Sequence, residues 1–287
     1  MTTKTSKTST RTKTRRKSTN KEELLHGLLA RFDAVIVAFS GGVDSTYLAW
    51  SASQVLGQRA LCVTADSSSY PDYHRQLALR TAREFGFHHE VIRTEELQRP
   101  EYRANPVDRC YYCKHELYST LSAMAVERGI PAILDGSNAD DRSDYRPGRK
   151  AAREFNVRSP LDEVDLSKEE IRQLSLRAGL PTWDEPASAC LSSRIPYHSE
   201  VTDEKLRTIE RAEAALRALG LRLFRVRHHD TLARLEIARE EMAQALEPAL
   251  REQIVRELRA IGYQHVTIDL QGYRMGSLNE GVRLRPA

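Results

Sequence analysis

Cysteine is scarce in this sequence, and long apolar runs are absent. Four cysteines among 287 residues are too few for the disulfide framework of a secreted domain. We therefore interpret them as thiols in a reducing compartment and expect a cytoplasmic location. No apolar run approaches the roughly 18 residues of a membrane span, and the first residues lack the apolar core of a secretory signal. These absences predict a soluble globular protein with no membrane partner.

Acidic residues are missing from the N-terminal segment. Residues 1–21 hold eight Lys or Arg, no Asp or Glu, and no apolar side chain after Met1. Such a segment cannot bury a core, so we expect residues 1–20 to be a disordered basic tail, either a solubilising extension or an arm that binds nucleic acid. The rest of the chain has 36 basic against 40 acidic residues, a net charge of −4. This mild acidity argues against a nucleic acid partner.

Apolar runs of strand length alternate with helical stretches after the tail. Continuous runs of this kind are typical of strands covered on both faces, as in a parallel sheet. Ser167 and Glu170 also predict a capping box at the start of a helix. The alternation predicts an α/β fold with a doubly wound parallel sheet over residues 21–199. The predicted strands lie at residues 34–39, 60–66, 89–94 and 132–136, and two of the predicted helices lie at 72–85 and 115–128.

A different order of elements begins near Val201. Thr202 is a candidate N-cap for a helix. The α-β-β-α-β order that follows predicts a second, smaller α+β domain over residues 200–287. Its later elements are predicted as strands over 221–229 and 233–238, a helix over 239–260 and a strand over 265–270.

A glycine-rich segment separates the first predicted strand from its helix. Its two glycines let the backbone curl around an anion, and the helix N-terminus offers free N–H groups and a positive dipole end. No lysine follows the glycines, so the segment is not a Walker loop for γ-phosphate transfer. The residues are Ser40, Gly41, Gly42, Val43, Asp44, Ser45 and Thr46.

This segment resembles the PP-loop of the adenine nucleotide alpha hydrolase-like ATP pyrophosphatases. The resemblance implies that the segment binds the pyrophosphate end of ATP and that cleavage falls between the α and β phosphates. It also implies that Asp44 helps to place Mg²⁺.

Polar residues follow two other predicted strands. Asp66 and Ser67 come after the second strand, and Gly136 and Asn138 come after the fourth. Ligands of open α/β sheets lie beyond the carboxyl ends of the strands, so we expect Asp66 and Ser67 to contact ATP. For Gly136 and Asn138, a contact with ATP is implied by the family resemblance described below. The polar segment after the fourth strand also contains Asp140, Asp141, Asp144, Tyr145 and Arg146.

Three of the four cysteines lie outside the predicted strands. Cys110 and Cys113 form a C-x-x-C, and Cys190 lies in a predicted loop over residues 181–199, whereas Cys62 sits in a strand and is expected in the core. We predict that the C-x-x-C also lies in a loop. A zinc site would need a fourth ligand. Three interpretations remain open: a [4Fe-4S] cluster on three thiolates with one open iron, a redox disulfide or persulfide, and purely structural cysteines.

Five motifs make the chain resemble the LarE family, the ATP-dependent sulfur transferases of nickel-pincer nucleotide biosynthesis. They span both predicted domains and occur in the family's order. The motifs are SGGVDST (40–46), CYYCKHELY (110–118), DGSNADDRSDYRPG (135–148), PASACLSSRIPY (186–197) and GYRMGSLNEG (272–281).

The resemblance implies a reaction on pyridinium-3,5-biscarboxylic acid mononucleotide. A carboxylate of this substrate is activated as an adenylate and then exchanges oxygen for sulfur. Some members sacrifice a cysteine at the position of Cys190, which becomes dehydroalanine, and these members lack the C-x-x-C. This chain is similar to the cluster-dependent branch, where Cys110, Cys113 and Cys190 would hold a [4Fe-4S] cluster with a removable sulfide. The resemblance also implies a homo-oligomer, with sulfide or a cysteine desulfurase as the sulfur donor.

Further charged residues are candidates for contacts with this acidic substrate. Arg225 and Arg227 lie on one face of a predicted strand, and paired guanidiniums suit a phosphate. In the family, arginines of this strand lie at the site. Glu236 alternates in the same way on the next strand, whereas His228 and His229 are expected at the surface. The remaining candidates are Arg146 and Arg194 for the substrate and Lys114 for a phosphate or carboxylate.

Two other functions remain open. A PP-loop tRNA thiolase would share the three cysteines and could use the basic tail, but the acidic folded body argues against it. A non-catalytic AMP-binding module is disfavoured because the phosphate loop is intact and three thiols accompany it.

Overall fold

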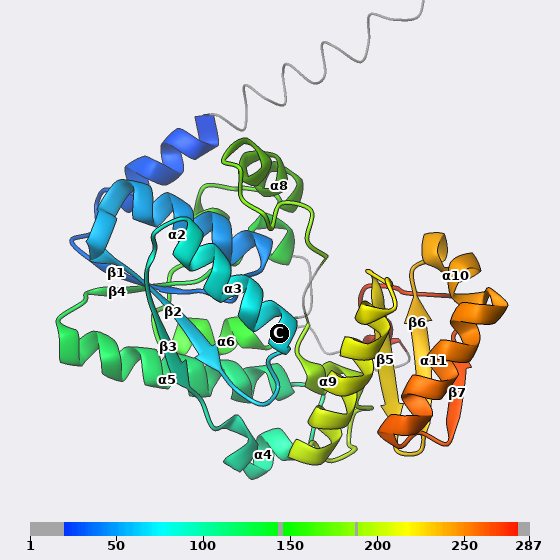
Figure 1. Ribbon diagram of the computed structural model, residues 1–287. Coiled ribbons are helices and arrows are strands. Elements are labelled where there is room, and N and C mark those ends of the chain that lie inside the picture. The colour runs from blue at the N-terminus through cyan, green and yellow to red at the C-terminus, as the bar shows by residue number, and fades with distance from the viewer. Residues whose placement is uncertain (1–19, 143–145, 187–188, 281–287) are drawn as a thin grey trace, which may run out of the picture. The chain divides into compact units, whose positions relative to one another are not determined.

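The computed structural model describes residues 20–142, 146–186 and 189–280 (Figure 1). The predicted tail lies outside the described residues except for Asn20, as do Asp144 and Tyr145. Contacts group the described chain into two compact units. The first comprises residues 20–66, 74–94 and 114–186, and the second comprises residues 67–73, 95–113 and 189–280. The predicted domain boundary between residues 199 and 200 stays a prediction. Residues 67–73, 95–113 and 189–199 precede this boundary and group with the C-terminal residues.

The first unit contains a four-stranded parallel sheet of order β3-β2-β1-β4. Each strand lies within two residues of its predicted position, so the predicted α/β fold is confirmed. In the centre, Ile36 of β1 is aligned with Leu61 of β2 on one side and with Ile133 of β4 on the other. The strands are β1 (Val35–Ala38), β2 (Ala60–Asp66), β3 (His88–Arg93) and β4 (Ala132–Leu134).

Helices cover both faces of this sheet. Right-handed crossovers place α2 and α3 on one face, and the reversal of strand order at β1 places α5 on the other (Figure 1). The core between the sheet and the helices on the α2 face contains Val37, Leu48 of α2, Ala78 of α3 and Leu174 of α8. The helices are α2 (Val43–Leu56), α3 (Asp72–Glu84), α5 (Arg109–Arg128) and α8 (Lys168–Arg177).

Short helices complete the connections. A helix also spans residues 20–29, before β1. None of the described helices is long and apolar enough to cross a bilayer. The short elements are η1 (Gly57–Arg59), η2 (Glu96–Gln98), α4 (Pro100–Arg103), η3 (Ala139–Arg142), α6 (Gly148–Glu154), α7 (Pro160–Glu163) and η4 (Leu191–Arg194).

The second unit contains a three-stranded sheet of order β5-β6-β7. β5 and β6 are antiparallel and β7 is parallel to β6. Val226 and Leu235 face a core that includes Leu216 of α9 and Leu258 of α11, so the opposite face carries the alternating charged residues. The elements are α9 (Asp203–Ala218), β5 (Phe224–His229), β6 (Leu232–Ile237), α10 (Arg239–Leu246), α11 (Pro248–Ile261), β7 (His265–Ile268) and η5 (Ser277–Asn279).

Local sequence signals set several helix ends as predicted. The Ser167–Glu170 capping box is present at α8, and the Thr202 side chain accepts the Lys205 N–H at α9. The prediction of a single helix over residues 239–260 is wrong. It is interrupted at Glu247, because Pro248 has no N–H to continue the first helix and instead begins α11.

Two further predictions are corrected. α5 begins at Arg109 rather than near residue 115, so Cys110 and Cys113 lie in its first two turns and not in a loop. His228 is buried instead of exposed, and its Nδ1 lies 2.9 Å from the Tyr263 hydroxyl. The strand turns this side chain toward the helix-covered face, whereas His229 is exposed as expected.

Candidate functional site

The phosphate loop forms the turn between β1 and α2. Gly41 has a positive φ of 65°, and a Cβ at this position would lie 2.8 Å from the Ala78 Cβ, so only glycine fits. The Ser40 N–H donates to Ser45 Oγ (3.2 Å), which donates to the Gly42 carbonyl (3.1 Å). Gly42 is the N-cap of α2 and makes no side-chain capping bond. The first N–H groups of α2 are therefore available to an anion.

The residues after β4 approach this loop closely. A Cβ at Gly136 would lie 2.9 Å from the Ser45 nitrogen and 3.0 Å from its Cα. The strand order reverses between β1 and β4, and open α/β sheets bind ligands at such a point. Asp135, which the sequence analysis missed, anchors this segment by accepting hydrogen bonds from Tyr118 (2.9 Å) and Ser159 (2.7 Å). The structure thus brings Gly136 against the loop.

Asp44 has one paired carboxylate oxygen and one unpaired oxygen. Its Oδ2 accepts a charge-assisted hydrogen bond from Lys168 Nζ, at the first position of α8. Its Oδ1 is buried and has no hydrogen-bond partner among the described residues, and the same holds for Thr46 Oγ1. A buried carboxylate oxygen without a partner is costly. The arrangement therefore fits a cation, and Mg²⁺ commonly uses one or two carboxylates together with substrate phosphates.

A polar turn beside Asp44 carries a second carboxylate. The Asn138 N–H donates to Asp141 Oδ2 (3.1 Å), and Asp141 Oδ1 pairs with Arg146 (2.8 Å). Burial raises the pKa of Asp141; Arg146 partly offsets this, and the nearby Asp44 charge adds to it. Arg146 is thus paired with a carboxylate that interacts electrostatically with Asp44 of the phosphate loop.

Three further predicted site residues, Asp66, Ser67 and Lys114, have neighbours of their own. The Asp66 carboxylate is 3.8 Å from Arg75, and Lys114 Nζ lies 5.3 Å from the centre of the Tyr118 ring. Neither side chain bonds to the phosphate loop in the described part of the chain. Ser67 Oγ lies 3.1 Å from Ser69 Oγ. The roles of Asp66, Ser67 and Lys114 stay predictions.

Three free cysteines belong to the second unit. Cys110 is exposed, whereas Cys113 and Cys190 are partly buried. Cys190 is the N-cap residue of η4. Among the described residues, no group of three or more His, Cys, Asp or Glu is arranged to hold a metal ion. Cys62 is buried in β2, where burial raises the pKa of its thiol to about 12, which confirms it as a core residue.

A buried arginine, which the sequence analysis missed, lies among these cysteines. Arg109 donates hydrogen bonds to the Asn105 side chain, to the Ser192 carbonyl (3.0 Å) and to Cys190 Sγ (3.8 Å). Burial lowers the pKa of Arg109, but Cys190, Cys110, Tyr102 and Tyr197 together raise it, and the net shift is upward. No carboxylate pairs with this guanidinium in the part of the chain that the structure describes. Among the described groups that accept its hydrogen bonds, Cys190 Sγ is the one that can carry a negative charge.

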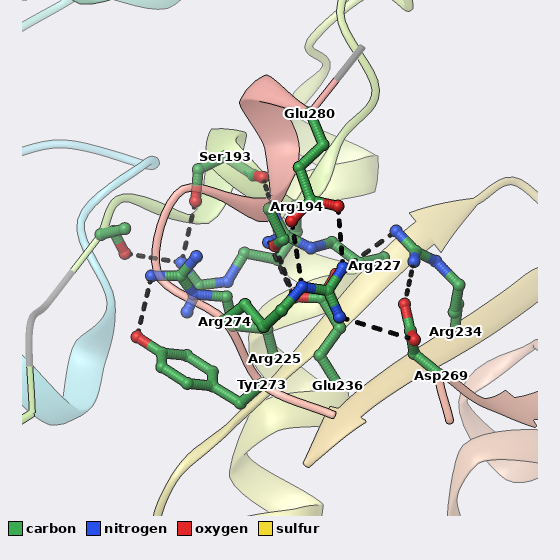
Figure 2. A network of polar contacts seen from close by, with 12 residues as sticks. Ser193, Arg194, Arg225, Arg227, Arg234, Glu236, Asp269, Tyr273, Arg274 and Glu280 are labelled. Atoms are coloured by element: carbon green, nitrogen blue, oxygen red, sulfur yellow. Dashed lines mark hydrogen bonds and ion pairs between the residues drawn. The ribbon is translucent and has the colours of Figure 1, made fainter. Parts of the chain in front are cut away.

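The charged face of the second sheet contains the predicted arginines (Figure 2). Arg227 is fully buried and donates to Glu236 (2.8 Å), Ser277 Oγ (2.6 Å) and the Ser193 carbonyl (2.5 Å). The second Glu236 oxygen lies 3.3 Å from Arg234, without hydrogen-bond geometry. Arg227 and Glu236 therefore hold each other in place.

Arg225 differs from Arg227 in its partners. Its guanidinium is buried, lies 4.8 Å from the centre of the Tyr273 ring and donates to the Tyr273 hydroxyl (3.1 Å). No carboxylate among the described residues pairs with it. Burial lowers the pKa of Arg225, and the Arg194 and Arg227 charges lower it further. Of these two arginines, Arg225 is therefore the better candidate to bind an anionic ligand, because it is a buried cation without a described counter-ion.

Arg194 connects the Cys190 segment to α9. Its guanidinium forms two bonds with Glu213 (2.7 and 2.9 Å) and donates to the carbonyls of Ala189 (2.8 Å) and Cys190 (3.2 Å). These bonds hold the backbone on both sides of the Cys190 Cα in one conformation. Its predicted contact with substrate stays a prediction.

Known proteins resemble this chain over most of its length. The asparagine synthase family matches residues 29–254. An uncharacterized protein of Synechocystis sp. is 45% identical over a region that covers 91% of this chain and 97% of that protein's length. The pyridinium-3,5-bisthiocarboxylic acid mononucleotide synthase of Lactiplantibacillus plantarum is 36% identical over 91% of this chain and 94% of its own. A glutamine-hydrolyzing GMP synthase of Aeropyrum pernix is 26% identical over 63% of this chain and 39% of its own.

These matches agree with the motifs, the parallel sheet and the lysine-free loop between β1 and α2. The chain belongs to the LarE family of ATP-dependent sulfurtransferases, within the PP-loop ATP pyrophosphatase superfamily.

Proposed function

We propose that the protein adenylates a carboxylate of pyridinium-3,5-biscarboxylic acid mononucleotide and replaces an oxygen of that carboxylate with sulfur. The match with the Lactiplantibacillus synthase over nearly the full length of both chains carries the proposal. A carboxylate is a poor electrophile, and transfer of AMP turns one of its oxygens into a leaving group. Pyrophosphate leaves in the first step and AMP in the second, when sulfur attacks the acyl carbon.

The phosphate loop supports the first step. The free N–H groups at the start of α2 would bind the pyrophosphate portion of ATP, and the unpaired Oδ1 of Asp44 would face Mg²⁺. Mg²⁺ would neutralise the charge that develops on the departing pyrophosphate. Gly136 and Asn138 would border the nucleotide from the end of β4.

The cysteines support the second step. Thiolate sulfur is the usual donor of a [4Fe-4S] cluster, although the described residues form no group of three arranged to hold a metal ion, so the three thiols would have to come together around it. Cys110, Cys113 and Cys190 are three free thiols, and the buried Arg109 would balance the negative charge of three thiolates. These three residues would hold the cluster, which would supply a removable sulfide. Sulfide or a cysteine desulfurase would replace the sulfur, and the protein would act as a homo-oligomer.

A sacrificial route remains as the alternative form of the same reaction. The Cys190 thiolate would attack the acyl carbon, release AMP and form a thioester. Loss of the Cys190 Cα proton would then break its Cβ–S bond, which leaves the thiocarboxylate and dehydroalanine. The hydrogen bond from Arg109 to Cys190 Sγ (3.8 Å) would orient this sulfur for the attack.

Product analysis tests the proposed function. Anaerobic protein supplied with ATP, Mg²⁺ and the dicarboxylate should form AMP and pyrophosphate in equal amounts. Mass spectrometry should detect the substrate with one oxygen exchanged for sulfur. Formation of ADP and inorganic phosphate would contradict the PP-loop chemistry. A full yield of AMP without any thiocarboxylate would contradict the sulfur transfer.

Substrate affinity tests the role of Arg225. If its guanidinium binds the substrate phosphate, Arg225→Ala should weaken substrate binding by about 10- to 100-fold, the range of a charge-assisted hydrogen bond. ATP affinity should change less than about twofold, because in this assignment Arg225 binds the substrate phosphate and not ATP. Calorimetric titration with each ligand provides both values.

Arg227→Ala is the informative comparison for Arg225→Ala. It removes the cation that hydrogen-bonds to the buried Glu236 carboxylate and leaves only the Arg234 contact at 3.3 Å, so we expect the main effect on melting temperature. Arg225→Lys should recover part of the substrate affinity. Unchanged substrate affinity in both alanine variants would show that neither arginine binds the substrate.

A further inference from the structure

One buried asparagine connects the segment before α5 to the segment that contains Cys190. Asn105 follows α4, is fully buried and has a left-handed backbone with a φ of 52°. This conformation is uncommon outside glycine, and asparagine is among the residues that adopt it most readily. A buried amide side chain also needs hydrogen-bond partners. The contacts of Asn105 therefore decide what this residue holds in place.

Asn105 forms three hydrogen bonds with residues 196–199. Its Nδ2 donates to the carbonyls of Pro196 (2.7 Å) and Ser199 (3.0 Å), and its backbone carbonyl accepts the His198 N–H (2.9 Å). The amide nitrogen has two hydrogens, so both are used. Asn105 thus holds the C-terminal end of the segment that begins at Cys190.

Arg109 extends these contacts to the N-terminal end of the same segment. It is the first residue of α5, is buried, and its guanidinium donates to Asn105 Oδ1, the Ser192 carbonyl (3.0 Å) and Cys190 Sγ (3.8 Å). The planar guanidinium holds several acceptors in fixed directions. Asn105 and Arg109 together therefore hold residues 190–199 at both ends.

An apolar cluster shields these bonds from water. Leu191 is buried together with Tyr102 of α4, and Cys113 packs against the same cluster. The Tyr102 hydroxyl is also hydrogen-bonded to Ser192 Oγ. Away from water, a polar group that loses its partner is costly, so these bonds support one another. The Cys190 segment is thus held in one conformation against the start of α5.

We propose that Asn105 and Arg109 are positioning residues for sulfur transfer. They hold the Cys190 segment against the start of α5 and so place the Cys190 thiol for reaction, without themselves exchanging a proton or a covalent bond. Both routes described above need this thiol, so the inference applies to either of them. It rests on the proposed function, since it assumes that the Cys190 thiol takes part in sulfur transfer.

Asn105→Gly tests the inference, because glycine adopts the φ of 52° without strain and only the side-chain bonds are lost. Amide hydrogen exchange of residues 190–199 should become about 10- to 100-fold faster, as expected when buried hydrogen bonds are removed from a local segment. Thiocarboxylate formation should fall about 10- to 100-fold, because misplacement of a reacting group has an effect of this size. Pyrophosphate release in the first turnover should change less than about twofold.

Asn156→Gly is the matched control. Asn156 also has a φ of 52°, belongs to the first unit, and gains the same freedom in the unfolded chain when it is replaced by glycine. Hydrogen exchange of residues 190–199, pyrophosphate release and thiocarboxylate formation should all equal those of the unmodified protein.

Arg109→Lys keeps the test valid if Asn105→Gly unfolds. Lysine keeps the charge but lacks the planar fork that holds three acceptors in fixed directions. Thiocarboxylate formation should fall about threefold to tenfold, the range of a single hydrogen bond, while pyrophosphate release is kept. Arg103→Lys is the control for this variant, because Arg103 is paired with Glu200 at an exposed site and should leave both rates unchanged.

Three outcomes would overturn the proposal. The first is unchanged hydrogen exchange of residues 190–199 in Asn105→Gly. The second is faster exchange with unchanged thiocarboxylate formation, which would make these bonds purely structural. The third is an equal loss of pyrophosphate release, because placement of the Cys190 thiol concerns only the second step. Failure of the proposed function is distinguishable, because then the unmodified protein itself would form no thiocarboxylate.

Discussion

Asp44→Asn is expected to lower the rate of AMP and pyrophosphate formation by roughly 100-fold or more, because the metal contribution to such a step is several kcal/mol. The substitution keeps the size of the side chain and removes the charge that would hold Mg²⁺. Binding of ATP in the presence of EDTA should fall much less, since the N–H groups of α2 remain. Release of radiolabelled pyrophosphate and metal-free nucleotide titration check the two parts.

Asp203→Asn is the matched control for this change. Asp203 also lies in the first turn of a helix, α9, and is paired with Arg207. Both substitutions remove a negative charge from a helix N-terminus, which costs typically 0.3–1 kcal/mol of stability. Only Asp44→Asn should stop adenylation. If Asp44→Asn still adenylates at the rate of the unmodified protein, the Asp44 carboxylate does not bind the catalytic metal.

Cys190→Ala is expected to abolish sulfur transfer while adenylation continues, since both proposed routes need this thiol. Cys110→Ala and Cys113→Ala separate the routes. If the three thiolates hold a cluster, each alanine variant should lose iron and sulfur transfer together. The unmodified protein should then contain about four irons per chain when purified without oxygen, and should turn over repeatedly with added sulfide. Iron analysis, absorption spectra and turnover counts provide the readouts.

The sacrificial route leads to different results. Cys110→Ala and Cys113→Ala would then stay active for one turnover, and Cys190 would lose the mass of H₂S. Iron-free protein that is fully active once and leaves dehydroalanine at position 190 would overturn the cluster. Cys62→Ala is the control in both cases, because this thiol is buried in β2 and should affect neither iron content nor sulfur transfer.

Predictions based on local patterns were reliable where one segment contains the whole physical cause. The four parallel strands follow from continuous apolar runs, since both faces of each strand are covered. The Ser167–Glu170 box is complete within four residues, and the alternation in β5 places Arg225 and Arg227 on one face. Pro248 was an equally local signal that the prediction of one long helix over residues 239–260 overlooked.

Predictions of contacts were weaker because the partner lies far away in the chain. Nothing in the C-x-x-C distinguishes a loop from the start of a helix, and nothing near Arg109 in the sequence identifies Cys190 as its neighbour. Arg225 and Arg227 look equivalent in β5. They differ because Arg227 donates to Glu236, Ser193 and Ser277, whereas within the described ranges Arg225 donates to Tyr273.

The sequence by itself determined the parallel sheet, the lysine-free phosphate loop and the family, because apolar runs, glycines and long motifs are properties of contiguous residues. Only the tertiary structure decided which charges meet. It brought Lys168 to Asp44, Gly136 to the start of α2 and Arg109 to Cys190. The physical reason is that ion pairs and close backbone contacts depend on distances of a few ångströms in space, which separation along the chain does not encode.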